Sequence, residues 1–224
     1  AWLPQNTEAL PRATVVRLEA RTDFDSFYPM EVVATPEETK GLLERSAAFM
    51  AQQRDNSGVL RPKGRALEAL PYLLFPEDRR FPIRMTDELP LRWVKSGPGT
   101  LFRGQAQRNE FYVFQIGVWA AQWNLVDTRV EFEGDIAKWL NCFNTGGTNW
   151  DGSPFERVVD VPKGKVQALW MGVDVPRGAK PGEYRATVTI RPANAPPAAV
   201  QLALRVLADE LLDRGDGEPW RLAR

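Results

Sequence analysis

The sequence contains no histidine among its 224 residues, and this absence narrows the chemistry that the chain can perform. It excludes Ser-His-Asp and Cys-His catalytic arrangements, the HExxH metal-binding helix and most zinc sites, because all of them use imidazole. Any reaction would have to rely on carboxylates, lysine, tyrosine or serine. We expect neither a metal site nor a cofactor.

Other features are scarce as well. Cys142 is the single cysteine, so the chain can form no internal disulfide. No apolar run approaches the ~18 residues that a membrane-spanning helix needs. Lysine plus arginine equals aspartate plus glutamate, at 29 each, and this balance argues against nucleic acid or a membrane as the partner. The chain starts at Ala1 without a basic and apolar leader, as expected of a fragment or of a protein whose signal peptide has been removed.

The N-terminal part contains one clear helix signal. The run "TVVRLEARTDF" (14–24) indicates a strand. Thr35 then suits an N-cap, Pro36 suits the first helical position, and Glu38 completes a capping box. Apolar residues recur at three-to-four spacing after it, which predicts a helix over 36–53. We expect residues 1–70 to form a strand-plus-helix segment that packs on the domain that follows.

From residue 71 onward, short apolar runs alternate with proline and glycine turns. "EFYVFQIGVWAA" (110–121) is apolar on both faces, which is typical of a central sandwich strand. Residues 182–190 and 199–207 alternate between apolar and polar side chains, which predicts an antiparallel pair. "YLLFPEDRRFPIRM" and "ELPLRWV" indicate edge strands, because prolines interrupt them.

These patterns predict a mainly β chain with one N-terminal helix. The fold class that fits them is an antiparallel β-sandwich, immunoglobulin-like or galactose-binding-like, over residues 71–208. The polar, glycine-punctuated tail 209–224 is typical of an exit linker.

Several segments, taken in order, resemble the N-terminal region of bacterial glycoside hydrolase family 123-like proteins, in their uncharacterised branch. They are "RRFPIRMTDELPLRW", "FRGQAQRNEFYVFQIGVWAA", "CFNTGGTNWDGSPFERVV", "VPKGKVQALWMGVDVPRGAKPGEYRATVTI" and "GDGEPWRLAR". The resemblance covers roughly residues 12–224. It implies a β-sandwich that precedes a (β/α)-barrel catalytic domain, glycan substrates that include N-acetylgalactosamine, and an extracytoplasmic location. The family's catalytic Asp-Glu pair lies in the barrel, so no catalytic residue is assigned here.

The resemblance implies a non-catalytic accessory domain that stabilises or walls the catalytic barrel of a glycoside hydrolase. The expected partners are the barrel and, through the parent enzyme, a glycan. We do not expect this chain alone to be an enzyme. The alternative is a carbohydrate-binding module that holds glycan through exposed tryptophans. The candidate residues for glycan binding or for a domain interface are Trp150, Asn149, Asp151, Asn144, Trp123 and Trp139.

Four of these candidates lie in the run "CFNTGGTNWDGSPF" (142–155). Glycine and asparagine favour turns here, and Trp150 sits at the tip of the polar run. Trp150 could stack on a sugar face, or it could anchor the loop on a neighbouring domain, which we favour. A calcium site built from the oxygens of Asn144, Asn149 and Asp151 is a weaker third interpretation.

Other reactive side chains are interpreted as structural. Cys142 has no nearby basic pair to lower its pKa, so we expect a small core residue. Glu110 opens the apolar run 111–121, and we expect a buried ion pair with Arg103 or Arg108. The neighbouring carboxylates are expected to be solvated or to form turns; they are Asp23/Asp25, Glu77/Asp78, Asp87/Glu88, Glu131/Glu133 and Asp209/Glu210.

Overall fold

The computed structural model describes residues 32–56, 71–83, 87–149 and 151–212. The first described helix, α2, spans Pro36–Asn56. The Thr35 backbone N–H donates to Glu38 Oε2 at 2.8 Å, and the Glu38 N–H donates to Thr35 Oγ1 at 3.2 Å. The predicted capping box and helix are therefore confirmed. The strand predicted within 14–24 lies outside the described residues.

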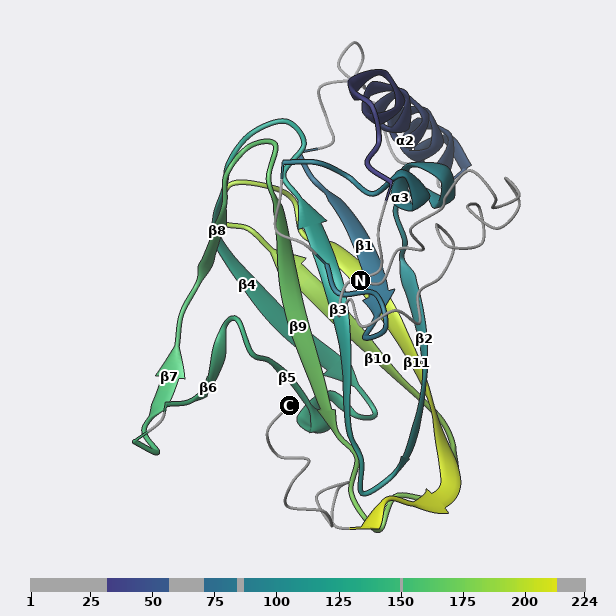
Figure 1. The fold of residues 1–224 in the computed structure, drawn as a ribbon, viewed down its shortest axis with the longest axis vertical. Helices are drawn as coiled ribbons and strands as arrows, with labels where there is room; N and C mark the ends of the chain where they lie inside the picture. The colour runs from purple at the N-terminus through teal and green to yellow at the C-terminus, as the bar shows by residue number, and fades with distance from the viewer. Residues whose placement is uncertain (1–31, 57–70, 84–86, 150, 213–224) are drawn as a thin grey trace, which may run out of the picture. The chain divides into compact units, whose positions relative to one another are not determined.

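The rest of the described chain is mainly β and forms two large sheets (Figure 1). The four-stranded sheet has the order β1-β3-β9-β5, and the five-stranded sheet has the order β2-β11-β10-β4-β8. Their bounds are β1 Leu73–Asp78, β3 Phe111–Trp119, β9 Val166–Asp174, β5 Leu140–Cys142, β2 Leu101–Arg108, β11 Ala198–Glu210, β10 Gly182–Arg191, β4 Leu125–Gly134 and β8 Val159–Val161. A separate two-stranded ladder consists of β6 Gly146–Thr148 and β7 Pro154–Glu156.

The pairings confirm the predicted sandwich. β10 and β11 pair antiparallel along their length, with Ala186 opposite Leu202 and Val188 opposite Val200. The pairs β1–β3, β3–β9 and β4–β10 are antiparallel too. β2 differs, since it pairs parallel with β11, with Leu101 opposite Gln201.

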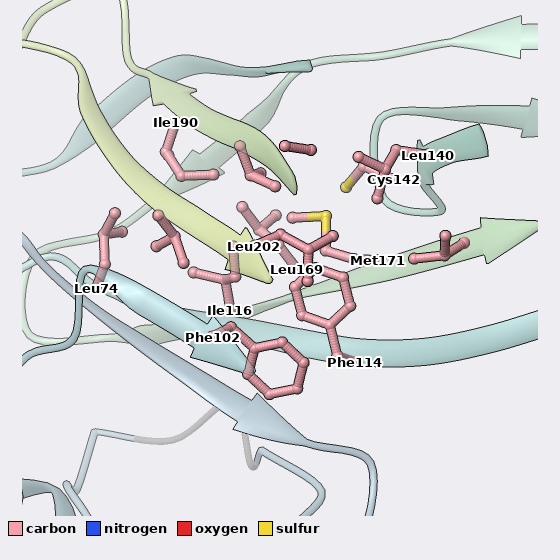
Figure 2. Packing of buried hydrophobic residues seen from close by; sticks show 14 of the residues in the cluster. Leu74, Phe102, Phe114, Ile116, Leu140, Cys142, Leu169, Met171, Ile190 and Leu202 are labelled. Atoms are coloured by element: carbon pink, nitrogen blue, oxygen red, sulfur yellow. The ribbon is translucent and has the colours of Figure 1, made fainter. Parts of the chain in front are cut away.

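The space between the two sheets is filled by their alternate side chains. Figure 2 shows Ile116 and Met171 from the four-stranded sheet meeting Leu202 from the five-stranded sheet. Tyr112, Phe114, Ile116 and Val118 supply this layer from β3, at every second position. The period of two is that of a strand with one face on the core.

The outer face of the four-stranded sheet is covered as well. A second cluster forms there, with Leu73 and Phe75 of β1 and Trp119 of β3. Trp93, from the short helix α3 (Leu91–Ser96), stacks on Phe75 with ring centroids 4.4 Å apart. Leu42 of α2 joins the same cluster. Because both faces of this sheet are covered, β3 is apolar in both alternations, as its sequence indicates.

One predicted edge strand is wrong. The run "ELPLRWV" forms α3, not a strand, and Gly97 with φ 78° ends this helix. The neighbouring side chains Trp93 and Val94 are both buried, which a strand with one solvent face would not allow. The other predicted edge strand is confirmed, since β1 lies at the edge of its sheet.

The predicted boundaries near residues 70 and 209 stay predictions, because residues 57–70 and 213–224 lie outside the described residues. Arg45 of α2 donates to the Val94 carbonyl at 3.0 Å, so α2 is bonded to α3. Among the described helices, none combines the length and the apolar character that crossing a membrane requires.

Candidate functional site

The candidate run 142–155 forms a hairpin that extends from the sandwich (Figure 1). β6 and β7 pair antiparallel, with Gly147 opposite Phe155. A Cβ added at Gly147 would lie 3.1 Å from the Phe155 ring, so glycine lets the ring lie over the ladder. The Arg157 guanidinium lies over the same ring, 5.5 Å from its centre. The hairpin is thus braced by its own side chains.

Asn144 holds the base of the hairpin. Its Oδ1 accepts a hydrogen bond from the Trp170 backbone N–H at 2.7 Å, at the point where β5 has left the edge of β9. Its carbonyl accepts from Arg157 Nε at 2.7 Å. The side chain therefore replaces a missing backbone partner of β9.

Asn149 and Asp151 form the turn at the tip. The Asn149 N–H donates to the Ser153 carbonyl at 2.8 Å, and Asp151 Oδ1 accepts from the Ser153 hydroxyl at 2.6 Å and from its N–H at 2.9 Å. These hydrogen bonds hold the pKa of the Asp151 carboxyl below its usual value. Asn144 is bonded at the base of the hairpin and the other two at its tip, so the three side chains serve different partners.

The candidate tryptophans occupy different segments. Trp150 lies outside the described residues. Trp123 is 38% exposed in the connection between β3 and β4. Trp139, in the 3-10 helix Ala137–Trp139, is partly buried and packs on Tyr184 with ring centroids 5.1 Å apart. No two tryptophan rings stack on each other within the described part of the chain.

Cys142 is a core residue, as the sequence predicts. It is 3% exposed and unpaired, next to Leu140 in the sandwich core (Figure 2). Burial raises the pKa of the Cys142 thiol. The residue is therefore poorly suited to act as a nucleophile.

Glu110 is structural, but its predicted ion-pair partner is wrong. The carboxylate pairs with Arg79 at 2.9 Å and accepts from the Gln107 N–H at 2.8 Å, whereas Arg108 pairs with Glu210. Arg79 follows β1. The sequence alone does not show that the end of β1 lies beside the β2–β3 turn, where Glu110 is found.

The prediction that Glu77 is solvated or forms a turn is also wrong. Its side chain is 11% exposed, pairs with Arg92 and accepts from Trp93 Nε1 at 2.7 Å. It fixes the indole that covers the outer face of β1.

A basic groove lies at the edge of β2 and was not predicted. It has a volume of about 430 Å³ and lies among residues from the end of β1, from β2 and β3, and from β10 and β11. Four arginines and two carboxylates line it: Arg79, Arg80, Arg103, Arg205, Asp78 and Glu183. The buried Tyr112 also contributes to the wall. The sequence signal was weak, because these arginines are spread over about 125 positions from 79 to 205.

A second, mainly apolar cavity of about 530 Å³ lies between α2, α3, β1 and the start of β11. Among the described residues, no group of three or more histidine, cysteine, aspartate or glutamate side chains is placed to hold a metal ion.

Comparison with known proteins gives one family match. Residues 140–192, which run from β5 through β10, match the glycoside hydrolase 123 N-terminal domain. Comparison with curated proteins gave no match.

Several solved structures show a limited similarity to this chain. A family 123 glycoside hydrolase from Clostridium perfringens, described in terms of glycolipid glycan hydrolysis, is 15% identical with a TM-score of 0.46; the similarity covers 63% of this chain and 28% of that one. A GH5 xyloglucanase from Bacteroides ovatus is 12% identical with a TM-score of 0.30, over 51% of this chain and 19% of that one. A type I cohesin from Pseudobacteroides cellulosolvens is 9% identical with a TM-score of 0.30, over 50% and 94%.

The similarity to the two hydrolases thus spans less than a third of their length. At these identities and TM-scores the solved structures carry no argument about activity. The family match does support the resemblance found in the sequence: the region from β5 through β10 is similar to the N-terminal domain of family 123 glycoside hydrolases.

Proposed function

We propose that this chain is a non-catalytic accessory β-sandwich of a glycan-hydrolysing enzyme that acts outside the cytoplasm. The observation that carries the proposal is the match of residues 140–192 to the glycoside hydrolase 123 N-terminal domain. The two-sheet sandwich supports it, because apolar side chains pack on both faces of the four-stranded sheet.

The ion pairs that several carboxylates form with arginines support a non-catalytic role. A glycosidase needs two carboxyl groups roughly 5–9 Å apart across a cleft, and one of them needs a raised pKa to act as the acid. Here Glu110 is paired with Arg79, Glu77 with Arg92 and Glu131 with Arg191. The Arg191 hydrogen bonds lower the pKa of Glu131, which is the wrong direction for a catalytic acid.

The hairpin is the surface that we assign to the neighbouring catalytic barrel. It extends from the sandwich, and Phe143 at its base is 41% exposed although its ring also touches Phe111. Val158, just after β7, is 39% exposed. Phe143 and Val158 thus flank the hairpin on either side in the sequence. Exposed apolar side chains of this kind are suited to burial against another domain.

The first test is an activity assay of purified 1–224 with aryl N-acetylgalactosaminides and other aryl glycosides. We expect no turnover. Leu204→Asp, which places a charge in the core and should unfold the chain, is the matched control for contaminating enzymes. Turnover by the folded chain that is lost in Leu204→Asp would contradict the accessory role.

The carbohydrate-binding module is the alternative outcome, and a second measurement separates it. Affinity electrophoresis through gels that contain polysaccharide should leave the mobility of the chain unchanged. Retardation that Trp123→Ala or Trp139→Ala abolishes would favour the module over the accessory role.

A further inference from the structure

The basic groove at the edge of β2 contains arginines with and without ion-pair partners. Arg79 pairs with Glu110 at 2.9 Å, and Arg80 pairs with Asp78 at 2.8 Å. Arg103 and Arg205 form no ion pair within the described part of the chain, although Glu183 is the cross-strand neighbour of Arg205. The groove therefore presents two guanidinium groups whose hydrogen-bond donors are available.

The strands explain why these side chains converge. Gln105 lies opposite Arg205, and Arg103 lies opposite Ala203, in the parallel pairing of β2 with β11. Arg103 and Arg205 thus project from the same face of neighbouring strands, offset by two positions. Ala203 leaves the space between them open.

Tyr112 provides a second, independent observation. Its side chain is buried, with 2% of the residue exposed, and the Arg79 guanidinium lies 5.1 Å from its ring centre. Its hydroxyl forms no hydrogen bond with any described residue, yet Tyr112 lines the groove. The hydroxyl reaches the groove without a protein partner among the described residues, so its hydrogen-bond donor is available to a ligand there.

Gly104 makes the hydroxyl accessible to the groove. A Cβ at Gly104 would lie 2.8 Å from the Tyr112 hydroxyl oxygen, so any other residue would occupy the position that the hydroxyl takes against β2. Burial raises the pKa of Tyr112 to about 12, and the hydroxyl therefore stays a donor at neutral pH.

We propose that this groove binds an acidic saccharide: the Tyr112 hydroxyl, which lies against the core face of β2 at its edge, donates to one oxygen of the saccharide, and Arg103 and Arg205, on the outer face of β2 and β11, hold its carboxylate or sulfate group. Planar guanidinium groups match such oxygens with paired hydrogen bonds. The oxyanion part of the inference rests on the groove itself, and the saccharide part rests on the proposed function.

The test is an NMR titration of the isotope-labelled chain with three probes: galacturonate, inorganic sulfate and neutral galactose. Saturable shifts of the Gly104 and Tyr112 amides are expected with one or both anions and not with galactose. Binding of galacturonate alone would identify a carboxylate site, and binding of sulfate alone would identify a sulfate site.

Variants test the residues. Arg103→Gln and Arg205→Gln should each weaken binding at least about fivefold, because each removes a charged donor. Tyr112→Phe keeps the buried ring and removes the hydroxyl alone, so it should weaken the binding of galacturonate without unfolding the chain. Arg129→Gln on β4, which removes the same charge outside the groove, should bind as the unmodified chain does.

No saturable shift with either anion, or equal weakening by Arg129→Gln, would overturn the inference. Either result would leave the accessory role untouched, because that role is tested by the absence of hydrolysis. Binding of galactose as tightly as galacturonate would also overturn it, since the groove would then not recognise the charge.

Discussion

At the scale of single residues, the structure depends on a few close approaches between side chains and backbone. Gly117 is the clearest, since a Cβ there would lie 2.5 Å from the Trp93 ring. The indole lies over β3 at this point, stacks on Phe75 and donates to Glu77. One missing methyl group thus allows α3 to cover the outer face of the sheet.

Gly117→Ala should lower the free energy of unfolding by about 1–3 kcal/mol, as overpacking of a buried site does. Urea denaturation measures the change. Gly178→Ala is the matched control, because nothing lies within 4 Å of a Cβ at that turn glycine. Equal stability of the two variants would show that the indole moves aside without cost.

Cys142 should react slowly with a thiol reagent in the native chain. Burial raises its pKa, so at pH 8 less thiolate is present than for an exposed cysteine, and the reagent also has little access. We expect the rate to be roughly tenfold lower or more than in urea-unfolded chain, and to rise as the pH approaches the raised pKa. A native rate equal to the unfolded rate would place the thiol at the surface.

The sequence predicted the structural roles of only some of these residues. Cys142 was predicted as core from its apolar neighbour and the absence of basic ones. Glu110 was predicted as structural, but Arg79 as its partner requires that the end of β1 lie beside the β2–β3 turn, which depends on sheet order. Tyr112 and Gly104 raised no signal, because their contact joins two strands across the core.

At the scale of elements, side chains supply hydrogen-bond partners where the backbone pairing between two strands ends. β5 pairs with β9 over three residues, and the Phe143 N–H then donates to the Trp170 carbonyl at 3.0 Å. The next donor, the Trp170 N–H, is satisfied by Asn144 Oδ1. Where the hairpin leaves the sheet, both the N–H and the carbonyl of Trp170 are therefore paired.

Asn144→Ala should lower the free energy of unfolding by about 1–3 kcal/mol, because it leaves a partly buried N–H without an acceptor. Asn144→Asp retains the oxygen and should lose less. Asn149→Ala at the exposed tip is a further control and should change stability little. Thermal denaturation of all three compares them, and an equal loss for Asn144→Ala and Asn149→Ala would contradict the assigned role.

Elements were predictable where local and long-range preferences agree. The Thr35 capping box predicted α2, and alternation predicted β10 and β11. The run 88–94 was misassigned because Pro90, which interrupts it, suggested an edge strand, whereas Trp93 and Val94 are buried against the four-stranded sheet as part of a helix. The parallel pairing of β2 with β11 has no local signature at all.

At the scale of the whole molecule, two apolar clusters share one sheet. The sandwich core lies on one face of β1, β3 and β9, and the second cluster lies on the other face of the same strands. Trp93 and Trp119 belong to the second cluster, whereas most strands belong to the sandwich. Both clusters pack on the same strands, so the loss of either cluster destabilises the strands on which the other one packs.

Unfolding should therefore be a single transition. Tryptophan fluorescence, which reports in part on the second cluster, and far-ultraviolet circular dichroism, which reports on the strands, should give the same urea midpoint. Gly117→Ala should shift both midpoints together. A fluorescence change that precedes the loss of circular dichroism would show that the second cluster opens independently.

The parallel pairing of β2 with β11 has a consequence for synthesis. Within the described sheets, β2 is hydrogen-bonded to one strand, β11, which lies about 100 residues further along the chain. During translation β2 therefore leaves the ribosome long before β11 has been made. Such distant contacts slow folding, and an unpaired strand is open to association with other chains in the meantime. Nascent chains that end before residue 198 should therefore depend on chaperones, and release of the last strand should mark the moment at which the domain becomes resistant to proteases.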